Sequence, residues 1–448
     1  MKKALTVIVC MVLYVSGLTA QNHSAASVDA VEQYKAAKRQ VLMNARDGSL
    51  VVVKPEVYDP ARYREESFLD EYGQRRPYAS QEEDPSWQIE KIIVRFNGFT
   101  ISMRWASECK VSQMAGLRTM LNQLSSKPFA VVVNDIARLA DRLHLSDWST
   151  LQLVRSVTQS VYGSASCPEA VASQAFMMRS LGFRIGLGAG DDGKMYLLPS
   201  FDARVRGMRE YYDDGIPFNL MSGQVNSMKE LLFFNQSDLA PVSLRLNVEE
   251  RFYPHYSDTV KYSSSAISVS VPVNSTLKEY YRNYPSYYAG DNQLLEFYNR
   301  ANLLMARDIK ENVYPSLISA VNGKTYVEAL DILLDFVQTA FDYQMDGDTW
   351  KDDRYFFPGE IWYYGTSDCD DKAILFSRLV RDILGLKVAL VYWPGHLSCA
   401  VHLDDMEKGY NFDVSGVKYM SCDPTSPGAR AGDVMEMFED VKASLILL

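Results

Sequence analysis

The sequence TSDCDDKAILFSRLVRDILGLKVALVYWPGHLSCAV, residues 366–401, decides the fold of the C-terminal part of the chain. After Cys369, apolar residues recur at three- and four-residue spacing, which predicts a helix that begins at or near this cysteine. The helix is expected to end at Gly385, and the apolar run at 387–393 is typical of a buried strand. A Pro-Gly turn then leads to a second strand that begins at His396. This pattern indicates an α+β fold in which a helix packs against an antiparallel sheet.

A cysteine, a histidine and an aspartate follow one another in settings that suit catalysis by a thiol. Cys369 lies at a helix start, where the helix dipole lowers a thiol pKa. His396 begins a strand, and Asp423 ends another directly before a proline, where its side chain can meet a neighbouring strand. A thiol nucleophile needs a base, and the base needs a carboxylate that fixes its tautomer. Each residue taken singly is more often structural, but together they form a coherent site for acyl transfer.

The segment 365–425 resembles the transglutaminase-like branch of the papain-like cysteine enzymes. Their core motif has an acidic-flanked cysteine at a helix start, a Gly-His in a strand and an Asp-Pro-Thr, and all three occur here in that order. The likeness extends upstream to 336–343, which looks like the family's helix before the catalytic loop. The resemblance implies a papain-like, transglutaminase-like domain with Cys369 as nucleophile, His396 as general base and acid, and Asp423 as the group that orients the imidazole.

Three aspartates surround the candidate nucleophile, at positions 368, 370 and 371. Negative charge beside a thiol opposes formation of the thiolate. The resembling families tolerate acidic flanks, so this feature leaves the reactivity of the thiol open. The alternative to an enzyme is a non-catalytic binding or scaffold protein that retains the transglutaminase-like fold.

The segment before the candidate nucleophile predicts a helix and then a long loop. A capping box and one apolar stripe predict the helix at 325–343. The loop at 344–368 carries aspartates without the spacing of a calcium loop, so we expect a solvated acidic loop and no metal or other cofactor. The candidate oxyanion-hole donors are Gln338, Trp362 and the backbone N–H of Cys369. Aromatic residues are predicted to form the wall of a substrate cleft, namely Trp350, Tyr355, Phe356, Tyr363, Tyr364 and Trp393.

Residues 1–20 have the pattern of a secretory signal peptide, with two lysines, an apolar run and a small-residue end at Ala20. We expect cleavage after Ala20 and a secreted or periplasmic protein. The net charge of the chain is −10, and removal of these two lysines makes it −12, which argues against nucleic acid or anionic lipid as a partner. No other segment is long and apolar enough to predict a membrane span.

Five cysteines follow the predicted signal, and an odd number leaves at least one thiol unpaired or paired between molecules. Cys399 and Cys422 should lie on neighbouring strands, on the face opposite His396 and Asp423. A disulfide between them is possible, and the alternative is two packed thiols. On either reading Cys369 is expected to be free.

The first half of the chain contains a weak repeat of the second. Residues 181–187 match 384–390 in character, and each segment follows an apolar-periodic helix. Extension without gaps places Gly193 at the position of His396, and Cys167 one residue away from the position of the candidate nucleophile. We therefore predict a degenerate relative of the C-terminal domain, in which Cys167 is not catalytic. The alternative is chance recurrence of a helix, a Leu-Gly turn and a strand.

The remaining patterns divide the chain. Asn97-Gly98 between two alternating runs predicts a β-hairpin. Alternation at 242–248 and 267–273 predicts two strands of a small β element, and the tyrosines within 280–288 are expected to pack between domains. The predicted divisions are a signal peptide (1–20), an arm or linker (21–85), a β-hairpin with the degenerate domain (86–235), the small β element and linker (236–290) and the catalytic domain (291–448).

These patterns together predict a secreted, cysteine-dependent acyl-transfer enzyme. Its expected substrate is a peptide or protein, attacked at a peptide or side-chain amide bond. The resulting thioester at Cys369 would pass its acyl group to water, as in a peptidase or amidase, or to an amine, as in a transglutaminase. The sequence leaves the choice between hydrolysis and transfer open, together with the oligomeric state.

Overall fold

The computed structural model describes residues 81–448 except for 112–116, 126, 222, 247–249, 289–293, 351–352 and 405–408. The predicted signal peptide and almost all of the predicted arm lie outside these residues. The described chain divides into two compact units. We call residues 81–255 and 283–288 the N-terminal unit, and residues 256–282 and 294–448 the C-terminal unit.

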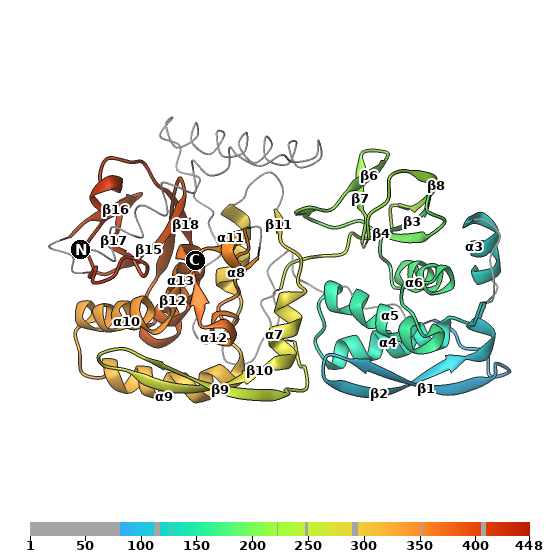
Figure 1. Cartoon of the computed structure of the whole chain (residues 1–448), viewed down its shortest axis with the longest axis horizontal. Helices are drawn as coiled ribbons and strands as arrows, with labels where there is room; N and C mark the ends of the chain where they lie inside the picture. The colour runs from blue at the N-terminus through green and yellow to red at the C-terminus, as the bar shows by residue number, and fades with distance from the viewer. Residues whose placement is uncertain are drawn as a thin grey trace. The chain divides into compact units, whose positions relative to one another are not determined.

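The N-terminal unit begins with the predicted hairpin, β1 paired with β2 (Figure 1). Its turn residues Asn97 and Gly98 have positive φ angles of 40° and 78°, which suit the tight turn of twisted strands. Further along, α6 packs on an antiparallel sheet of order β4-β3-β8. The elements are β1 (Ile89–Phe96), β2 (Phe99–Ala106), η2 (Ser107–Cys109), α3 (Leu117–Ser125), α4 (Ala130–Arg142), α5 (Asp147–Tyr162), α6 (Pro168–Ser180), β3 (Ile185–Gly190), β4 (Met195–Pro199), β5 (Arg204–Val205), β6 (Glu210–Asp213), β7 (Ile216–Asn219), β8 (Met228–Phe234) and β11 (Tyr287–Tyr288).

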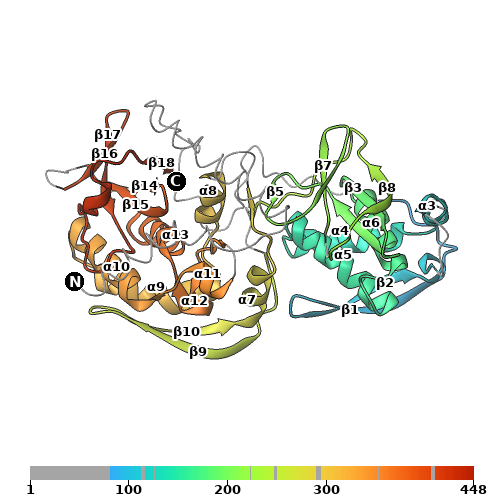
Figure 2. The same cartoon turned by 45° about the horizontal axis from the view of Figure 1, so that its top comes forward.

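The C-terminal unit contains a five-stranded sheet of order β16-β17-β15-β14-β18, in which every pairing is antiparallel (Figures 1 and 2). Helix α13 packs on β14 and β15. The predicted α+β class with antiparallel sheets is therefore confirmed. The elements are β9 (Tyr256–Ser263), β10 (Ser268–Asn274), α7 (Ser275–Arg282), α8 (Leu294–Asn302), α9 (Arg307–Val321), α10 (Tyr326–Ala340), β12 (Asp342–Tyr343), α11 (Asp346–Thr349), α12 (Ile361–Tyr364), β13 (Thr366–Ser367), α13 (Cys369–Leu379), η3 (Val380–Leu384), β14 (Val388–Trp393), β15 (His396–His402), β16 (Asn411–Val414), β17 (Val417–Cys422), η4 (Glu436–Phe438) and β18 (Ser444–Leu447).

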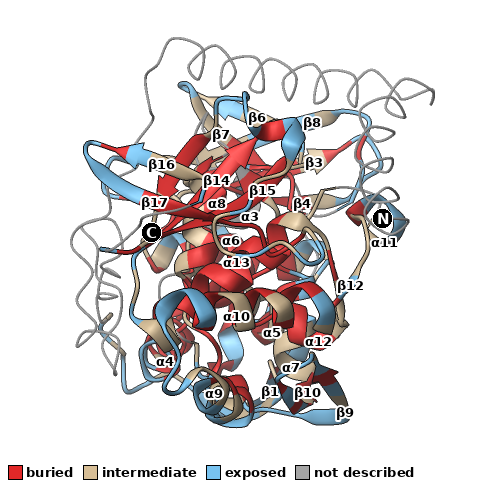
Figure 3. Cartoon of the chain, turned by 90° about the vertical axis from the view of Figure 1, so that its left-hand side faces the viewer, coloured by how far each residue is buried: buried red, intermediate tan, exposed pale blue. Residues whose placement is uncertain are grey.

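The helix and two strands predicted from residues 366–401 form the centre of this unit. Helix α13 begins at Cys369, continues into the π-turn η3, and ends at Gly385, whose φ of 66° is the left-handed value that glycine adopts readily. All six side chains of β14 are buried, because α13 covers one face and a second apolar cluster covers the other. Figure 3 shows α13, β14 and β15 as largely buried elements.

The small β element differs from its prediction. The partner of β10 is β9, not the alternating segment at 242–248. Val242 and Leu244 are buried, which explains the alternation, but in this stretch the described residues form one isolated parallel bridge, between Val242 and Phe201, instead of a strand. The predicted 236–290 division is therefore split between the two units.

The clustered tyrosines are buried inside the units. Tyr280 and Tyr281 belong to α7 of the C-terminal unit, where Tyr281 packs on Phe357 at 5.1 Å between ring centroids. Tyr284 belongs to the N-terminal unit and donates a hydrogen bond to the carbonyl of Leu244 at 2.8 Å.

Both units contain a helix followed by an antiparallel hairpin, α6-β3-β4 in one and α13-β14-β15 in the other. After each helix a glycine with positive φ follows, Gly182 at 93° and Gly385 at 66°. Cys167 is the N-cap residue of α6, and Cys369 is the first residue of α13. The matching order agrees with the predicted repeat, while common origin stays a prediction.

Within the part of the chain that the structure describes, no helix has the length and apolar character that a membrane span requires.

Candidate active site

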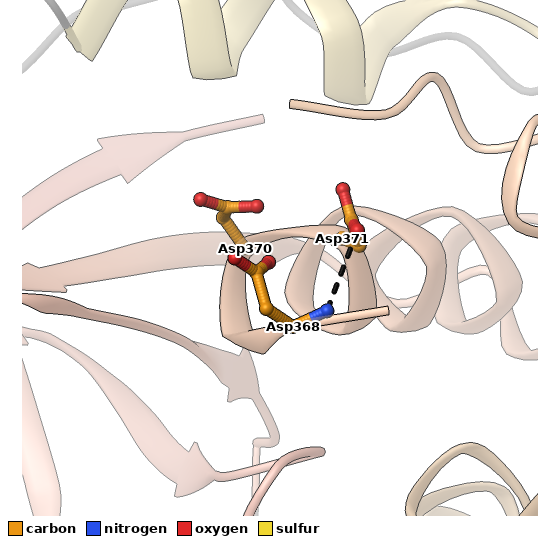
Figure 4. A group of neighbouring side chains, drawn as sticks. All are labelled: Asp368, Asp370 and Asp371. Atoms are coloured by element: carbon orange, nitrogen blue, oxygen red, sulfur yellow. Dashed lines mark hydrogen bonds between the residues drawn. The ribbon is translucent and has the colours of Figure 1, made fainter. Parts of the chain in front are cut away.

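Cys369 lies in the first turn of α13, where the chain is held by a capping box. Asp368 is the N-cap residue, and its backbone N–H donates to the Asp371 carboxylate at 3.4 Å (Figure 4). The other Asp371 oxygen accepts from the N–H of Phe356 at 2.7 Å. These bonds fix both the helix start and the preceding loop, so the position of the Cys369 side chain is set by two acidic neighbours.

His396 and Asp423 meet across the end of the sheet, as the sequence predicted. The His396 Nε2 atom lies 3.0 Å from Asp423 Oδ2, and both side chains are buried. The other carboxylate oxygen, Oδ1, accepts from the backbone N–H groups of Thr425 at 2.9 Å and Ser426 at 3.3 Å. Burial alone would raise the pKa of Asp423, but the charge and hydrogen bond of His396 and the two N–H groups lower it. Asp423 therefore stays ionised and fixes the imidazole.

The imidazole has one nitrogen left for chemistry. Because Nε2 is bonded to Asp423, the free nitrogen of His396 is Nδ1, which is buried and has no hydrogen-bond partner. In the neutral ring, Nε2–H donates to the carboxylate and Nδ1 carries the lone pair. His396 is thus held in the tautomer in which Nδ1 can accept a proton.

Cys369 is linked to this histidine through the next residue of β15. The backbone N–H of Leu397 favours the thiolate of Cys369, and this places the sulfur beside the start of β15. The remaining environment acts in the opposite direction. Burial raises the pKa of Cys369 well above its ordinary value, and the charges of Asp368, Asp423 and Asp371 raise it further. The expectation that the helix dipole would lower this pKa is wrong, because desolvation and nearby carboxylates outweigh the dipole.

An aromatic stack holds the plane of the imidazole. Phe438 of η4 lies 5.3 Å from the His396 ring at an interplanar angle of 4°, and Trp393 lies 6.0 Å away at 17°. The Trp393 indole also stacks on Phe438 at 4.8 Å and donates from Nε1 to the carbonyl of Val441 at 3.2 Å. Trp393 therefore does lie at the site, as a support for the histidine.

Gln338 has a different role from the predicted oxyanion donor. Its Nε2 donates to the carbonyls of Asp423 at 2.9 Å and Ala429 at 3.0 Å, and its Oε1 accepts from the N–H of Gly428 at 3.0 Å. Both amide hydrogens are already engaged, so the structure leaves no donor for an oxyanion. Gln338 instead positions the backbone of Asp423 and the loop that follows it.

Lys372 is a residue of the site that sequence reasoning missed. Its Nζ is buried and donates to the C-terminal carbonyls of α10, those of Gln338 at 3.1 Å and Phe341 at 2.9 Å. Burial lowers the pKa of Lys372 to about 8, against the opposing effect of carboxylates that include Asp342 and Asp368. The available signal was a lysine on the apolar face of the predicted helix, three positions after Cys369.

Trp362, the other side-chain candidate for the oxyanion hole, is packed in the core of the C-terminal unit. Its ring contacts Tyr262, Phe336 and Phe341 at centroid distances of 5.4, 6.1 and 5.1 Å. Its Nε1 is buried and has no hydrogen-bond partner, so a donor is available there. None of its described ring contacts involves Cys369, His396 or Asp423.

The predicted aromatic cleft wall stays a prediction, and of its residues Trp393 is the one with a described contact to His396. Tyr355, Phe356 and Tyr363 are buried in the C-terminal unit. Aromatic rings pack against one another here because each buries a large apolar area. The ring contacts are Tyr355 with Phe297 at 4.6 Å, Phe356 with Tyr364 at 5.2 Å, and Trp350 with Tyr364 at 5.1 Å.

A cavity of about 680 Å³ does reach the candidate site, on the side of Asp423. It is formed by the loop after β17, and Ser426, Gly428 and Asp433 line it together with Asp423. This loop is the one that Gln338 holds. Apart from Gly409, Tyr410 and Asp423, the residues that line this cavity belong to chain that follows Asp423, a segment that the sequence did not mark.

Acidic residues close to Cys369 are buried. One of them, Asp346, belongs to the loop that was expected to be solvated, whereas Asp348 of the same loop is exposed. Asp346, Asp370 and Asp371 are each at most 9% exposed. Burial first, and mutual repulsion second, raises the pKa of each, to about 8 for Asp346. Carboxylate oxygens of Asp368, Asp370 and Asp371 lie within 4.8 Å of one another, a spacing that suits a metal ion (Figure 4). Since Asp371 is already engaged as a helix cap, this cluster serves the helix start.

The remaining cysteines decide between the two alternatives for Cys399 and Cys422. Cys399 and Cys422 are directly opposite one another on β15 and β17, as predicted, but both thiols are free. The Cys399 thiol donates to the carbonyl of Ala373 at 3.2 Å. The structure therefore shows two packed thiols. Cys167 is half-buried, with its sulfur 3.6 Å from the carbonyl of Ser164.

The chain matches no protein-family model, and a search of curated proteins finds no match either. The argument for function therefore rests on the geometry of the site.

Proposed function

We propose that the C-terminal unit is a cysteine-dependent acyl-transfer enzyme with a papain-like, transglutaminase-like fold. Its substrate would be a peptide or protein amide, and the protein would act outside the cytoplasm, as the predicted signal peptide suggests. One observation carries the proposal. His396 is bonded to Asp423 through Nε2, which leaves a buried, unpartnered Nδ1 beside the segment that reaches the Cys369 sulfur.

In the proposed mechanism, His396 Nδ1 takes the Cys369 proton as the sulfur attacks the carbonyl carbon of the amide. The tetrahedral intermediate then collapses, the C–N bond breaks, and the imidazolium returns its proton to the leaving amine. The product is a thioester at Cys369. Water or a second amine gives a proton to Nδ1 and attacks the thioester, and the proton passes back to the departing sulfur.

The raised pKa of Cys369 decides how this step would start. A thiol whose pKa lies well above the ordinary range is protonated at neutral pH, so the resting form of Cys369 is the neutral thiol. Proton transfer would therefore accompany attack, as in general base catalysis, rather than precede it. Asp423 favours this course because it stabilises the imidazolium as it forms.

The test uses p-nitrophenyl acetate as an acyl donor with the full chain. We expect a burst of p-nitrophenol and an acetyl adduct at Cys369, read by peptide mass. In the His396→Ala variant the rate of the burst should fall about a hundredfold, since general base catalysis contributes at least that much to the rate. The Cys399→Ala variant controls for acylation of other thiols. Equal adduct formation in wild type and His396→Ala would contradict the proposal.

The second candidate function is a non-catalytic binding protein that keeps this fold. The observation in its favour is the environment of Cys369, where burial and three aspartates disfavour the thiolate. This candidate predicts neither a burst nor an adduct, and a thiol whose alkylation rate is the same in wild type and His396→Ala at every pH.

A further inference from the structure

A groove in the N-terminal unit carries positive charge and no described acidic residue. It has a volume of about 460 Å³ and lies between the outward faces of β1 and α5. Arg95 and the exposed Ile93 come from β1, and Arg155 and Gln152 come from α5. An acid-free groove with two arginines stands out in a chain with a net charge of −10. The groove is unrelated to the residues of the proposed acyl-transfer site.

Neither arginine of this groove has a partner among the described residues. Other arginines of the same unit do pair, since Arg104 bonds to Asp135 and Glu83 at 2.8 Å each. Arg155 is only half-exposed, and burial lowers its pKa without any carboxylate to offset the effect. Partial burial of an unpaired guanidinium costs free energy, and an anion in the groove would recover that cost.

The neighbouring polar groups leave donors free on one side of the groove. The Gln159 side chain is engaged at both ends, because its Nε2 donates to the carbonyl of Gly163 at 2.6 Å and its Oε1 accepts from the N–H of Ala165 at 2.8 Å. The Gln152 side-chain amide makes no described hydrogen bond. The two guanidinium groups and the Gln152 amide are thus the groove side chains for which no donated hydrogen bond is described, and this set fits an oxyanion.

We propose that this groove binds the oxyanion group of a ligand, with Arg155 and Arg95 as its charge partners and Gln152 as a neutral donor. The planar guanidinium presents paired N–H groups that match both carboxylate and phosphate oxygens. Ile93, which is 58% exposed at the edge of the groove, offers an apolar contact to the body of the ligand.

The experiment is titration calorimetry of the full chain with inorganic phosphate and, separately, with acetate, at constant ionic strength maintained with sodium chloride. We expect saturable binding of at least one probe. Tighter binding of phosphate would identify a phosphorylated ligand, and tighter binding of acetate a carboxylate ligand. Absence of saturable binding for both probes would overturn the proposal.

The variants locate the site. Arg155→Gln should raise the dissociation constant at least tenfold. Arg95→Gln, on a different element, should raise it severalfold. Arg142→Gln is the matched control, because Arg142 is an exposed arginine at the end of α4, outside the groove. Circular dichroism checks folding, and Arg95→Gln tests the site alone if Arg155→Gln does not fold. If Arg142→Gln raised the dissociation constant as much as Arg155→Gln does, binding would reflect general charge attraction, and the proposal would be overturned.

Discussion

At the scale of single residues, the main feature of the candidate site is the conflict between Cys369 and its acidic neighbours. The Leu397 N–H favours the thiolate, whereas burial and the charge of Asp368 disfavour it. Of the carboxylates that raise the pKa of Cys369, Asp368 acts most strongly. The reactivity of the thiol should therefore respond to this one side chain.

We predict that Asp368→Asn lowers the pKa of Cys369 and raises its alkylation rate at neutral pH severalfold. The amide keeps the shape of the N-cap side chain and removes its charge. The measurement is the rate of iodoacetamide labelling of Cys369 against pH, read by peptide mass. Asp348→Asn, in the exposed part of α11, is the control and should leave the rate unchanged. A labelling profile that does not move in Asp368→Asn would show that burial alone sets this pKa.

A second residue-scale prediction concerns Gln338. The Gln338→Glu variant keeps the size of the side chain but replaces two donated hydrogen bonds, to Asp423 and Ala429, with oxygen facing oxygen. We expect it to lower the free energy of unfolding by about 2–3 kcal/mol, since each buried bond contributes about 1 kcal/mol and an unsatisfied carbonyl adds to the loss. Denaturant unfolding measures the change. Gln236→Glu, at an exposed position, should have almost no effect, and an equal loss in both variants would contradict the argument.

The contrast between these residues shows what the sequence could predict at this scale. The pairing of His396 with Asp423 was predictable, because each lies at a strand end marked by a local motif. The use of Gln338 and Lys372 was not, because their partners are backbone carbonyls and N–H groups of segments distant in the sequence or at the end of another helix. Such bonds leave no pattern in composition or periodicity.

At the scale of elements, the start of α13 concentrates buried acid. Its capping box consists of Asp368 and Asp371, and Asp346 of α11 is buried nearby and accepts from the N–H of Arg354 at 2.5 Å. The sequence predicted the helix start correctly, but it did not predict the burial of Asp346 in the loop before the helix. Aspartates in a loop are usually solvated, as Asp348 is, and the burial of Asp346 depends on the tertiary fold around it.

Stability should therefore fall as the pH rises from about 4 to 8. The pKa of Asp346 is raised to about 8 when folded, so in this range the folded chain holds a proton that the unfolded chain has lost. Raising the pH then favours the unfolded state, by up to about 1.4 kcal/mol per pH unit for each such carboxyl. Asp346→Asn should flatten this dependence, because the amide does not titrate. Thermal unfolding between pH 4 and 8 measures it, with Asp348→Asn as control, and an unchanged slope in Asp346→Asn would count against the burial argument.

At the scale of the whole molecule, the sequence predicted the class of the fold better than its divisions. The hairpin of β9 and β10 lies within the predicted small β element and linker, yet it belongs to the C-terminal unit, where Tyr262 donates to the carbonyl of Trp362 at 2.6 Å. This contact joins residues a hundred positions apart. Alternation identifies a strand, but it does not identify the partner that buries it, so the hairpin was placed outside the unit to which it belongs.

The two helix-hairpin segments of the chain lead to the last prediction. Each presents a cysteine at a helix start, Cys167 before α6 and Cys369 in α13, but only the second is followed by a histidine paired with an aspartate. Among described residues the turn between β3 and β4 contains Gly193, with a φ of 75°, and no imidazole. If catalysis needs a base, the first cysteine cannot replace the second.

We therefore expect Cys369→Ala to abolish the p-nitrophenol burst and Cys167→Ala to leave it unchanged. Both substitutions remove one thiol at a helix start, so each controls for the other. Unfolding by denaturant checks that the two variants remain folded. Titration of the total thiol content of each variant confirms that one thiol group has been lost. A burst that survives in Cys369→Ala and disappears in Cys167→Ala would move the chemistry to the N-terminal unit. If both variants kept the burst, the reaction with p-nitrophenyl acetate would belong to a side chain other than these two cysteines. The geometry of His396 and Asp423 would then need a structural explanation.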